Sequence, residues 1–429
     1  MPRPSTPRLL LLLPTATYRT TAFVEAARRL HIDLTVASEQ ANTFQQAQPD
    51  RLLTLDFGRP ERAAAQARAF ARQLPVHGVV GVDDDTAVVA AAIAVGLELR
   101  GNPLAAALAA RDKHRQRTLL AQSGVPVPRF ALHTAAEDPE DIAARVRYPC
   151  VLKPLRLSAS RGVIRADDAA GFVVAFRRLK AILEQPDVAG CGPEDGQFLV
   201  EDFIPGPELA LEGLVTDGRL HVLAVFDKPD PLDGPFFEET IYVTPSRLPR
   251  MAQREVGACA QAAVTALGLR TGPVHAELRY NAWGPWLVEL AARPIGGRCS
   301  GALRFTAGEE GRGKGEASSL EELIVRHALG MDLPTLEREP LASGVMMIPV
   351  PGGAGAGVLR EVRGVAAARA VPLVEDVEIT AHPGQTLVPW PEGSRYPGFI
   401  FARGETPEAV EQALRAAHAR LEFVIDAAD

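Results

Sequence analysis

The chain has 429 residues, which is enough for two or three domains with substantial hydrophobic cores. Apolar residues make up 47% of it and charged residues 23%, proportions that are ordinary for a soluble globular enzyme. The net charge of −7 disfavours nucleic-acid binding, for which a basic surplus is typical.

The first apolar run, Leu9–Leu13, follows basic residues and could be read as a secretory leader. Its apolar core is too short, and Pro14 ends it before any small-residue cleavage site, so we predict a buried β-strand instead. No apolar stretch approaches the length of a transmembrane helix, so we expect no contact with a membrane.

Cysteine usage bears on the compartment and on zinc binding. The four cysteines lie far apart and form no CxxC pair, which favours reduced thiols in a cytoplasmic protein and gives no zinc signature. They are Cys150, Cys191, Cys259 and Cys299.

Residues 8–110 alternate strand-like and helix-like segments, a pattern that predicts a small parallel sheet. The expected strands are Leu9–Leu13, Asp33–Ala37 and Gly78–Val82, and the expected helices are Thr21–Leu30 and an alanine-rich one that ends near Val95. Asp83–Asp85 follow the third strand, where open α/β sheets bind ligands. We favour the simpler interpretation that they cap the next helix.

The middle of the chain begins with a helix over Arg111–Ser123, which stops at the Gly-Val-Pro-Val-Pro sequence of residues 124–128. Strands are then expected over Tyr148–Pro154 and Val163–Ala166. Between them, residues 156–162 (RLSASRG) form a loop of small residues with two arginines. Its backbone N–H groups make it a plausible cover for phosphates, so we call it the cover loop.

Further strands are expected over Phe198–Ile204 and from Glu208 onward, followed by an alanine-rich helix over residues 253–268. The segment from about Leu341 reads as a separate small α+β unit that ends in the helix Thr406–Leu421.

The most informative stretch is residues 274–297, because it places Glu277 and Glu289 on two strands joined by a turn at residues 281–285. Alternate residues on paired strands share a face, so both carboxylates should point to one spot. Like charges held together repel unless a cation lies between them, and Mg²⁺ with nucleotide phosphates is a common solution. The alternative is an exposed hairpin with two unrelated acids.

Two motif matches are rejected. Gly308–Lys314 has the spacing of a phosphate-binding P-loop, but Gly315 stands where Ser or Thr is needed and no buried strand leads into it. Gly353–Gly357 contains GxGxG without the βαβ context of a dinucleotide site, so a glycine-rich turn is expected there.

Taken in order, these elements resemble the ATP-grasp superfamily, and within it the carboxylate–amine ligases that include L-amino-acid (dipeptide) ligases. The "RDK" of residues 111–113 with the break at 124–128 matches the entry into the grasp. The Glu-Asp-Phe-Ile-Pro-Gly-Pro-Glu run of residues 201–208 is similar to the hinge that recognises adenine. Residues 397–404 are similar to the C-terminal domain of L-amino-acid ligases.

The resemblance implies an ATP-grasp fold of α/β and α+β multidomain class, with an N-terminal parallel-sheet (pre-ATP-grasp) domain, a central lid subdomain and a C-terminal α+β domain. The implied limits are residues 1–110 for the N-terminal domain, 111–200 for the lid with its linker helix, 201–335 for the catalytic subdomain and 336–429 for the small C-terminal domain. Many relatives are dimers, so a homodimer is one expectation.

The resemblance also implies roles for single residues. ATP and Mg²⁺ are the implied cofactors, with Mn²⁺ as a substitute, and Glu277 and Glu289 match the metal carboxylates. The residues implied in nucleotide binding are Lys113, Lys153, Ser158, Ser160, Gly162, Glu201, Asp202, Phe203, Ile204 and Glu208, the last in the ribose position. Arg293 would stabilise the acylphosphate and oxyanion, Lys228 is a candidate third phosphate contact or an exposed loop lysine, and Glu239 and Arg298 are expected at the substrate pocket.

Two departures from the family pattern stand out. Ala291 replaces an Asn that many members carry two residues after the second metal carboxylate, so either water replaces that ligand or one metal site is weaker. His275 stands where D-alanine ligases have arginine, which argues against that activity. It is either an oxyanion donor or a structural residue.

The implied chemistry transfers the γ-phosphoryl group of ATP to an amino-acid carboxylate and joins the acylphosphate to an amine, releasing ADP and phosphate. The substrates are therefore small molecules, and the sequence does not specify which amino acids are joined. The alternatives are a purine-pathway ribonucleotide synthetase and a non-catalytic nucleotide-binding regulator, the latter favoured only by Ala291.

Overall fold

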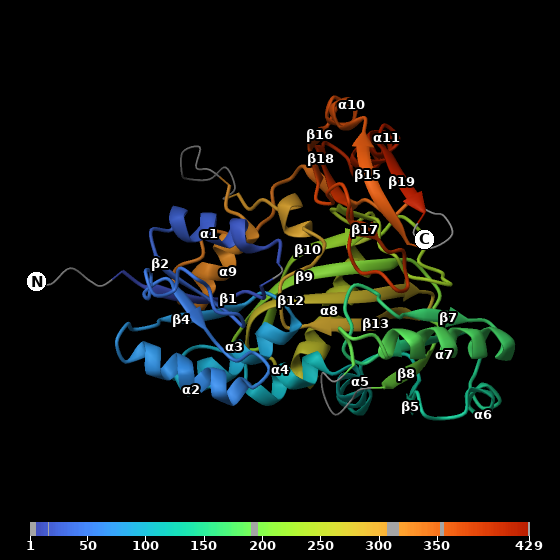
Figure 1. Cartoon of the computed structure of the whole chain (residues 1–429), viewed down its shortest axis with the longest axis horizontal. Helices are drawn as coiled ribbons and strands as arrows, with labels where there is room; N and C mark the ends of the chain where they lie inside the picture. The colour runs from blue at the N-terminus through green and yellow to red at the C-terminus, as the bar shows by residue number, and fades with distance from the viewer. Residues whose placement is uncertain (1–5, 16, 190–195, 307–316, 352–355, 428–429) are drawn as a thin grey trace, which may run out of the picture.

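The computed structural model describes residues 6–15, 17–189, 196–306, 317–351 and 356–427. Cys191 and the rejected Gly308–Lys314 match lie outside these ranges, as does most of Gly353–Gly357. Figure 1 shows a central sheet with the N-terminal sheet beside one end and a smaller, helix-covered sheet beside the other. In the described part of the chain, no helix is both long enough and apolar enough to cross a membrane.

The N-terminal sheet is parallel, as the alternation of elements predicts, with the order β3-β2-β1-β4. Its strands are β1 (Arg8–Leu12), β2 (Asp33–Ser38), β3 (Leu52–Thr54) and β4 (Gly78–Gly81). The accompanying helices are α1 (Thr20–Arg29), α2 (Pro60–Ala71) and α3 (Asp84–Gly96). Strand β3 and helix α2 were not predicted from the sequence.

The apolar run at the start of the chain is the central strand β1, and Leu9–Leu12 are completely buried. Leu9 and Leu11 belong to one hydrophobic cluster, whereas Leu10 and Leu12 belong to another on the opposite face. A parallel strand covered on both faces needs apolar residues at every position, which explains why this run does not alternate.

The helix expected over Arg111–Ser123 is α5 (Lys113–Gln122), and a separate helix, α4 (Leu104–Arg111), precedes it. Asp112 ends α4 and caps α5, because its carboxylate accepts a hydrogen bond from the Arg115 backbone N–H at 2.9 Å. An aspartate at a helix N-cap satisfies one of the free N–H groups of the first turn. The predicted helix is therefore confirmed with a start at Lys113 rather than Arg111, whereas α4 was not predicted.

A second, antiparallel sheet has the order β5-β8-β6-β7 and carries the cover loop between β6 and β7. Its strands are β5 (Phe130–Thr134), β6 (Cys150–Pro154), β7 (Ile164–Ala166) and β8 (Gln197–Asp202), and its helices are α6 (Pro139–Ala143) and α7 (Ala169–Leu183). The buried face of α7 packs on the sheet, with the rings of Phe176 and Phe198 5.6 Å apart.

The central sheet is antiparallel throughout and has the order β13-β12-β9-β10-β11-β14-β18-β16. Its strands are β9 (Glu208–Thr216), β10 (Arg219–Asp227), β11 (Ile241–Thr244), β12 (Thr271–Asn281), β13 (Gly284–Ala291), β14 (Ala342–Met347), β16 (Val374–Ile379) and β18 (Gly398–Gly404). Helix α8 (Arg250–Leu267) covers one face, and α9 (Leu320–Ala328) packs beside α1 on the other side.

The C-terminal part of the chain continues the central sheet through β14, β18 and β16 and then adds a small sheet of order β17-β15-β19. The remaining elements are η1 (Cys299–Ala302), β15 (Gly357–Arg363), α10 (Val365–Arg369), β17 (Thr386–Leu387), α11 (Pro407–His418) and β19 (Glu422–Ala427). The unit expected after Leu341 is therefore not separate at the level of the sheet. The four expected domain ranges stay a prediction.

Candidate active site

The β12–β13 hairpin brings Glu277 and Glu289 directly opposite each other, as their spacing predicts. The register is interrupted by a bulge immediately after Glu277, so Leu278 faces Leu287 rather than Val288. Two carboxylates at one cross-strand position would repel unless cations neutralised them.

Two lysines neutralise Glu289. Lys113 at the start of α5 places Nζ 3.1 Å from Oε1, and Lys153 near the end of β6 places Nζ 3.7 Å from Oε2. Burial favours the protonated carboxyl, but the two ammonium groups outweigh this and lower the pKa of Glu289 below its ordinary value. The structure thus gathers both predicted phosphate lysines around one predicted metal carboxylate.

Lys228 is the cation beside Glu277, and its buried position excludes the exposed-loop alternative. Its Nζ lies 2.8 Å from Glu208, 2.5 Å from Glu239 and 3.0 Å from Glu277. Burial favours neutral lysine, yet the three carboxylates raise the pKa of Lys228 well above its usual value. Burial and the charge of Glu277 raise the pKa of Glu239 to about 7.

The carboxylates of Glu208, Glu239 and Glu277 offer oxygens within 4.8 Å of one another, and the Lys228 ammonium group contacts all three. Glu208 was predicted at the ribose and Glu239 at the substrate, so this cluster was not predicted from the sequence. The carboxylates of Glu277 and Glu289 offer oxygen ligands, which fit Mg²⁺ or Mn²⁺.

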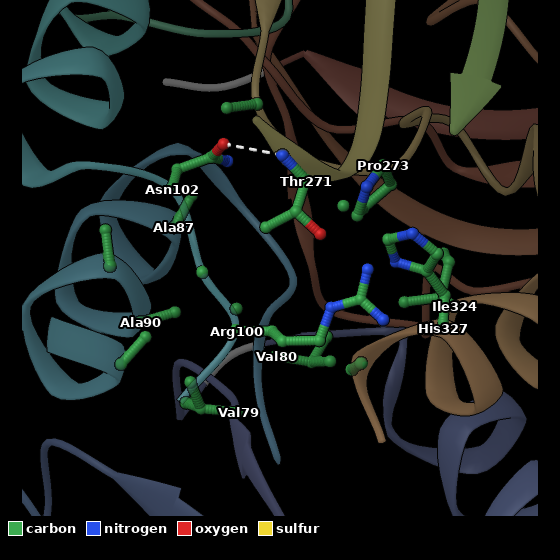
Figure 2. Close-up of a pocket in the computed structure, with 17 residues that line it drawn as sticks. Val79, Val80, Ala87, Ala90, Arg100, Asn102, Thr271, Pro273, Ile324 and His327 are labelled. Atoms are coloured by element: carbon green, nitrogen blue, oxygen red, sulfur yellow. Dashed lines mark hydrogen bonds between the residues drawn. The ribbon is translucent and has the colours of Figure 1, made fainter. Parts of the chain in front are cut away.

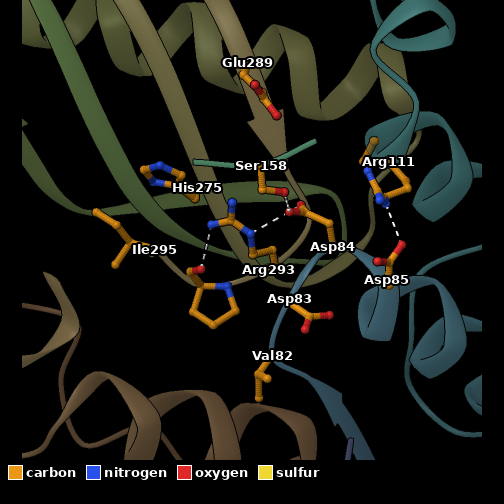
Figure 3. Close-up of polar contacts among 12 residues, drawn as sticks. Val82, Asp83, Asp84, Asp85, Arg111, Ser158, His275, Glu289, Arg293 and Ile295 are labelled. Carbon is orange, nitrogen blue, oxygen red and sulfur yellow. Dashed lines mark hydrogen bonds and ion pairs between the residues drawn. The ribbon is translucent and has the colours of Figure 1, made fainter. Parts of the chain in front are cut away.

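The three aspartates after β4 have three different roles (Figure 3). Asp83 caps α3 in a reciprocal capping box with Thr86, as favoured from the sequence. The carboxylate of Asp84 lies 3.3 Å from Arg293 Nε and accepts a hydrogen bond from Ser158 Oγ at 3.0 Å, whereas Asp85 pairs with Arg111 at 2.7 Å. The capping interpretation is therefore incomplete.

Asp84 is a functional candidate that the sequence analysis underweighted, although its place at a strand's carboxyl end was a signal. Burial disfavours its charge, but Arg293, Arg111 and Lys113 outweigh burial and hold its pKa well below the ordinary value. The orientation of the Arg293 side chain is fixed by two contacts, because its Nη1 also donates a hydrogen bond to the Pro294 carbonyl at 3.0 Å.

His275 is buried between two carboxylates, with Nε2 3.6 Å from Glu277 and Nδ1 3.8 Å from Glu212. Neither distance is a hydrogen bond of normal length, and Nδ1 and Glu212 Oε1 have no hydrogen-bond partner among the described residues. Burial lowers the pKa of His275, so the ring is neutral at neutral pH. The structure places it beside Glu277, the predicted metal ligand.

The predicted adenine hinge is occupied largely by contacts within the protein. Glu201 pairs with Arg117 at 2.6 Å, and both side chains are buried. Asp202 lies 3.8 Å from Arg147. Sequence reasoning missed Arg117, although it follows Lys113 by four residues and so shares a face of α5.

A second arginine holds the other end of the hinge. Arg279 lies over the Phe203 ring at 4.9 Å, donates to the Ile204 carbonyl at 3.1 Å and pairs with Glu208 at 3.1 Å. It was also missed, although alternation along β12 puts it on the same face as Glu277.

The cover loop lies against the cluster. Lys113 Nζ donates to the Leu157 carbonyl at 3.0 Å, and Ser158 reaches Asp84. Ser160 has φ of 55° and Gly162 has φ of 72°, so the backbone turns through the left-handed region. A side chain at Gly162 would also meet Pro154 at 2.8 Å, so glycine is required there.

Arg298 points toward the C-terminal part of the chain. It forms an ion pair with Glu378 and lies 5.7 Å from the ring of Phe399. A place for Arg298 at the substrate pocket stays a prediction.

A separate pocket lies where α3 meets the beginning of β12 (Figure 2). Small residues of α3 form one wall, and Arg100, Asn102 and His327 add polar groups. It holds none of the predicted site residues.

Comparisons with known proteins agree with this architecture. The ATP-grasp N-terminal domain family matches residues 24–101, the ATP-grasp domain family residues 146–302, and the L-amino acid ligase C-terminal domain 2 family residues 354–426. The chain therefore belongs to the ATP-grasp superfamily and has its fold, as predicted.

Within that superfamily, the fold is similar to the crystal structure of an L-amino acid ligase from Bacillus licheniformis. The TM-score is 0.76 at 25% identity, covering 99% of this chain and 100% of the other. An N5-carboxyaminoimidazole ribonucleotide synthetase from Thermotoga maritima has a TM-score of 0.68 at 15% identity, covering 97% and 99%, which shows the shared fold alone.

Curated relatives match over part of the chain. Alanine–anticapsin ligase of Bacillus subtilis is 29% identical over 47% of this chain and 44% of its own length. D-alanine–D-alanine ligase of Cupriavidus metallidurans is 30% identical over 47% of this chain and 59% of its own. The chain thus spans about half the length of the curated relatives it matches.

Proposed function

We propose that this protein is an ADP-forming carboxylate–amine ligase that joins an amino-acid carboxylate to an amine, giving a dipeptide or a related amide. The observation that carries the proposal is the opposed Glu277–Glu289 pair, surrounded by Lys113, Lys153 and Lys228. Three ammonium groups and two acids at one point suit a polyphosphate with its metal. The ligase-type C-terminal region supports the same activity.

In this proposal Lys113 and Lys153 neutralise the ATP phosphates, and the backbone of residues 201–204 receives the adenine. Glu277 and Glu289 would hold Mg²⁺, which would offset the charge of the phosphates. Lys113 and Lys153 pair with Glu289, and Lys228 pairs with Glu277. When nucleotide and metal bind, the lysines therefore leave these carboxylates and contact the phosphates, and the carboxylates contact the metal.

The proposed reaction has two steps, phosphoryl transfer to the carboxylate and then attack by the amine. A carboxylate oxygen attacks the γ-phosphorus, the bond to the bridging oxygen breaks, and ADP leaves. The amine nitrogen then attacks the acyl carbon, a C–N bond forms, the amine loses a proton and phosphate leaves. Arg293 would stabilise the oxyanion, and the loss of one such donor typically costs about 3–4 kcal/mol in the transition state.

Glu239 is the substrate residue that the geometry favours most, since burial raises its pKa to about 7 and it faces Lys228 and Tyr242. Small-molecule amino acids are the proposed substrates, and we place the reaction in the cytoplasm. A homodimer stays a prediction.

The first test is turnover with ATP, Mg²⁺ and pooled amino acids, with ADP, AMP and product masses measured. We expect ADP and a mass equal to two amino acids minus one water. The Glu289→Ala variant should lose turnover while keeping the wild-type melting temperature, and Glu140→Ala, at an exposed site on α6, is the control.

Near-normal turnover of Glu289→Ala would contradict the metal assignment, and AMP as product would contradict the acylphosphate route. Turnover that requires a phosphoribosyl substrate would favour a purine-type synthetase. Tight ATP binding without ADP release in any pool would favour the non-catalytic regulator.

A further inference from the structure

A short segment of the C-terminal part, Trp390–Glu392, contacts the cover loop more than two hundred residues away in sequence. We call this segment the strap. Trp390 Nε1 donates to the Ala159 carbonyl at 2.8 Å, and the Gly162 backbone N–H donates to the Pro391 carbonyl at 2.8 Å. Both bonds end on loop backbone atoms, so they fix the path of the loop itself.

The strap also reaches the helix behind the loop. Glu392 forms a two-point ion pair with Arg178 of α7, at 2.5 Å and 2.8 Å. Two parallel N–H···O bonds between a guanidinium and a carboxylate restrict orientation as well as distance. Arg178 additionally lies 4.5 Å from the ring of Phe236, which limits its movement.

The strap is anchored on its own side. The Trp390 side chain is buried and packs against the Tyr396 ring at a centroid distance of 4.8 Å. Tyr396 in turn lies near Phe399 of β18, a strand of the central sheet. These ring contacts therefore connect the strap to the sheet that carries Glu277.

The loop backbone needs such support, because Ala159 and Ser160 both have φ of 55°. Non-glycine residues in the left-handed region are strained and persist where surrounding contacts hold them. On one side of the loop, Lys113 and Asp84 form hydrogen bonds with residues 157 and 158. The strap forms hydrogen bonds with residues 159 and 162.

We propose that Trp390 and Glu392 are positioning residues that keep the cover loop in its nucleotide-holding conformation, so that affinity for MgATP depends on the C-terminal part. The inference rests on the proposed function, because it takes the cover loop to bind phosphates. A loop ordered before binding loses less conformational entropy when the nucleotide arrives. The strap would therefore act on nucleotide affinity and far less on the chemical step.

The test uses Trp390→Phe, which removes the indole donor but keeps an aromatic ring, and Glu392→Gln, which removes the charge. Arg177→Gln is the control, since Arg177 lies on the same helix and its ion pair in the described part of the chain is with exposed Glu140. The full-length proteins are compared for binding of a non-hydrolysable ATP analogue with Mg²⁺, for KM and kcat, and for hydrogen exchange of residues 157–163.

Each strap variant should raise the Kd for the analogue and the KM for ATP about five- to tenfold, the effect of losing one or two hydrogen bonds. The kcat at saturating ATP should stay within about twofold, exchange in the loop should speed up, and Glu392→Asp should recover part of the affinity. Arg177→Gln should match the unaltered protein.

Unchanged Kd and unchanged exchange in both variants would overturn the positioning role, as would a lower melting temperature with normal affinity. If the unaltered chain bound no nucleotide, the proposed function would fail. The exchange measurement would then still decide whether the strap holds the loop.

Discussion

Single charged side chains in the candidate site are held in defined protonation states by their neighbours. Glu289 and Asp84 are buried, which alone would raise their pKa values, yet adjacent lysines and arginines lower them. The cations thus keep both carboxylates ionised at neutral pH, the form that can bind a metal or orient an arginine.

At His327, burial and a neighbouring positive charge act in the same direction on the pKa, which predicts that the stability of the fold depends on pH. Burial, followed by the charge of Arg100, lowers the pKa of His327 to about 4 from 6.5, so the unfolded chain takes up the proton more readily. The contribution to stability is complete above pH 6.5 and is lost as the pH falls toward 4. A difference of about 2.5 pKa units corresponds to roughly 3 kcal/mol.

Urea unfolding of the wild type and of His327→Gln at pH 7 and pH 4.5 checks this prediction. Glutamine can keep the contact with Thr216, which lies 3.0 Å from His327 Nε2. The wild type should lose more unfolding free energy between the two pH values than the variant. Equal losses would show that His327 does not titrate differently in the two states.

At the scale of elements, β1 and the β12–β13 hairpin illustrate two kinds of sequence pattern. The unbroken leucine run predicted a buried strand, and the spacing of Glu277 and Glu289 predicted a cross-strand pair. Both depend on local periodicity, which side chains express wherever a strand forms. Helix α4 was not predicted, and the start of α5 was placed two residues too early, because Arg111 and Asp112 look helical in composition although Asp112 caps the helix.

The burial of β1 predicts a large cost for shortening one of its side chains. Leu11→Ala should lower the free energy of unfolding by about 2–5 kcal/mol, since it leaves a cavity in a fully buried cluster. Leu132→Ala, on the exposed side of β5, is the matched control and should cost less than about 1 kcal/mol. Denaturant unfolding of both variants gives the comparison. A cost for Leu11→Ala no larger than for Leu132→Ala would contradict the role of β1.

At the scale of the whole molecule, the candidate site exists only where several parts of the chain meet. Asp84 comes from the N-terminal sheet, Ser158 from the cover loop and Arg293 from the segment after β13 (Figure 3). The N-terminal part therefore contributes a side chain to the site in addition to packing beside it.

This meeting point predicts that Asp84→Asn will lower kcat by about tenfold or more, because Arg293 loses the charge that orients it. Asp84→Glu should retain more activity than Asp84→Asn, and Asp85→Asn, at an exposed neighbouring carboxylate, is the control. Steady-state kinetics with saturating ATP and Mg²⁺ provides the readout. Wild-type kcat in Asp84→Asn would contradict a role for the Asp84–Arg293 pair.

The sequence by itself determined the class of fold, through its resemblance to a known family, and the strands that carry Lys153, Glu277 and Glu289. The strands follow from periodicity and from glycine and proline positions, all of which act over a few residues. The same local information could not exclude the capping interpretation of Asp84, because a capping aspartate and a ligand aspartate look alike in sequence.

Only the tertiary structure decided which distant side chains share an environment. It paired Glu201 with Arg117, surrounded Lys228 with three carboxylates and turned Arg298 toward Glu378. It also joined the C-terminal part to the central sheet and brought Trp390 to the cover loop. Charges and hydrogen bonds act across space between residues far apart in the chain, so their partners are set by how the sheets pack.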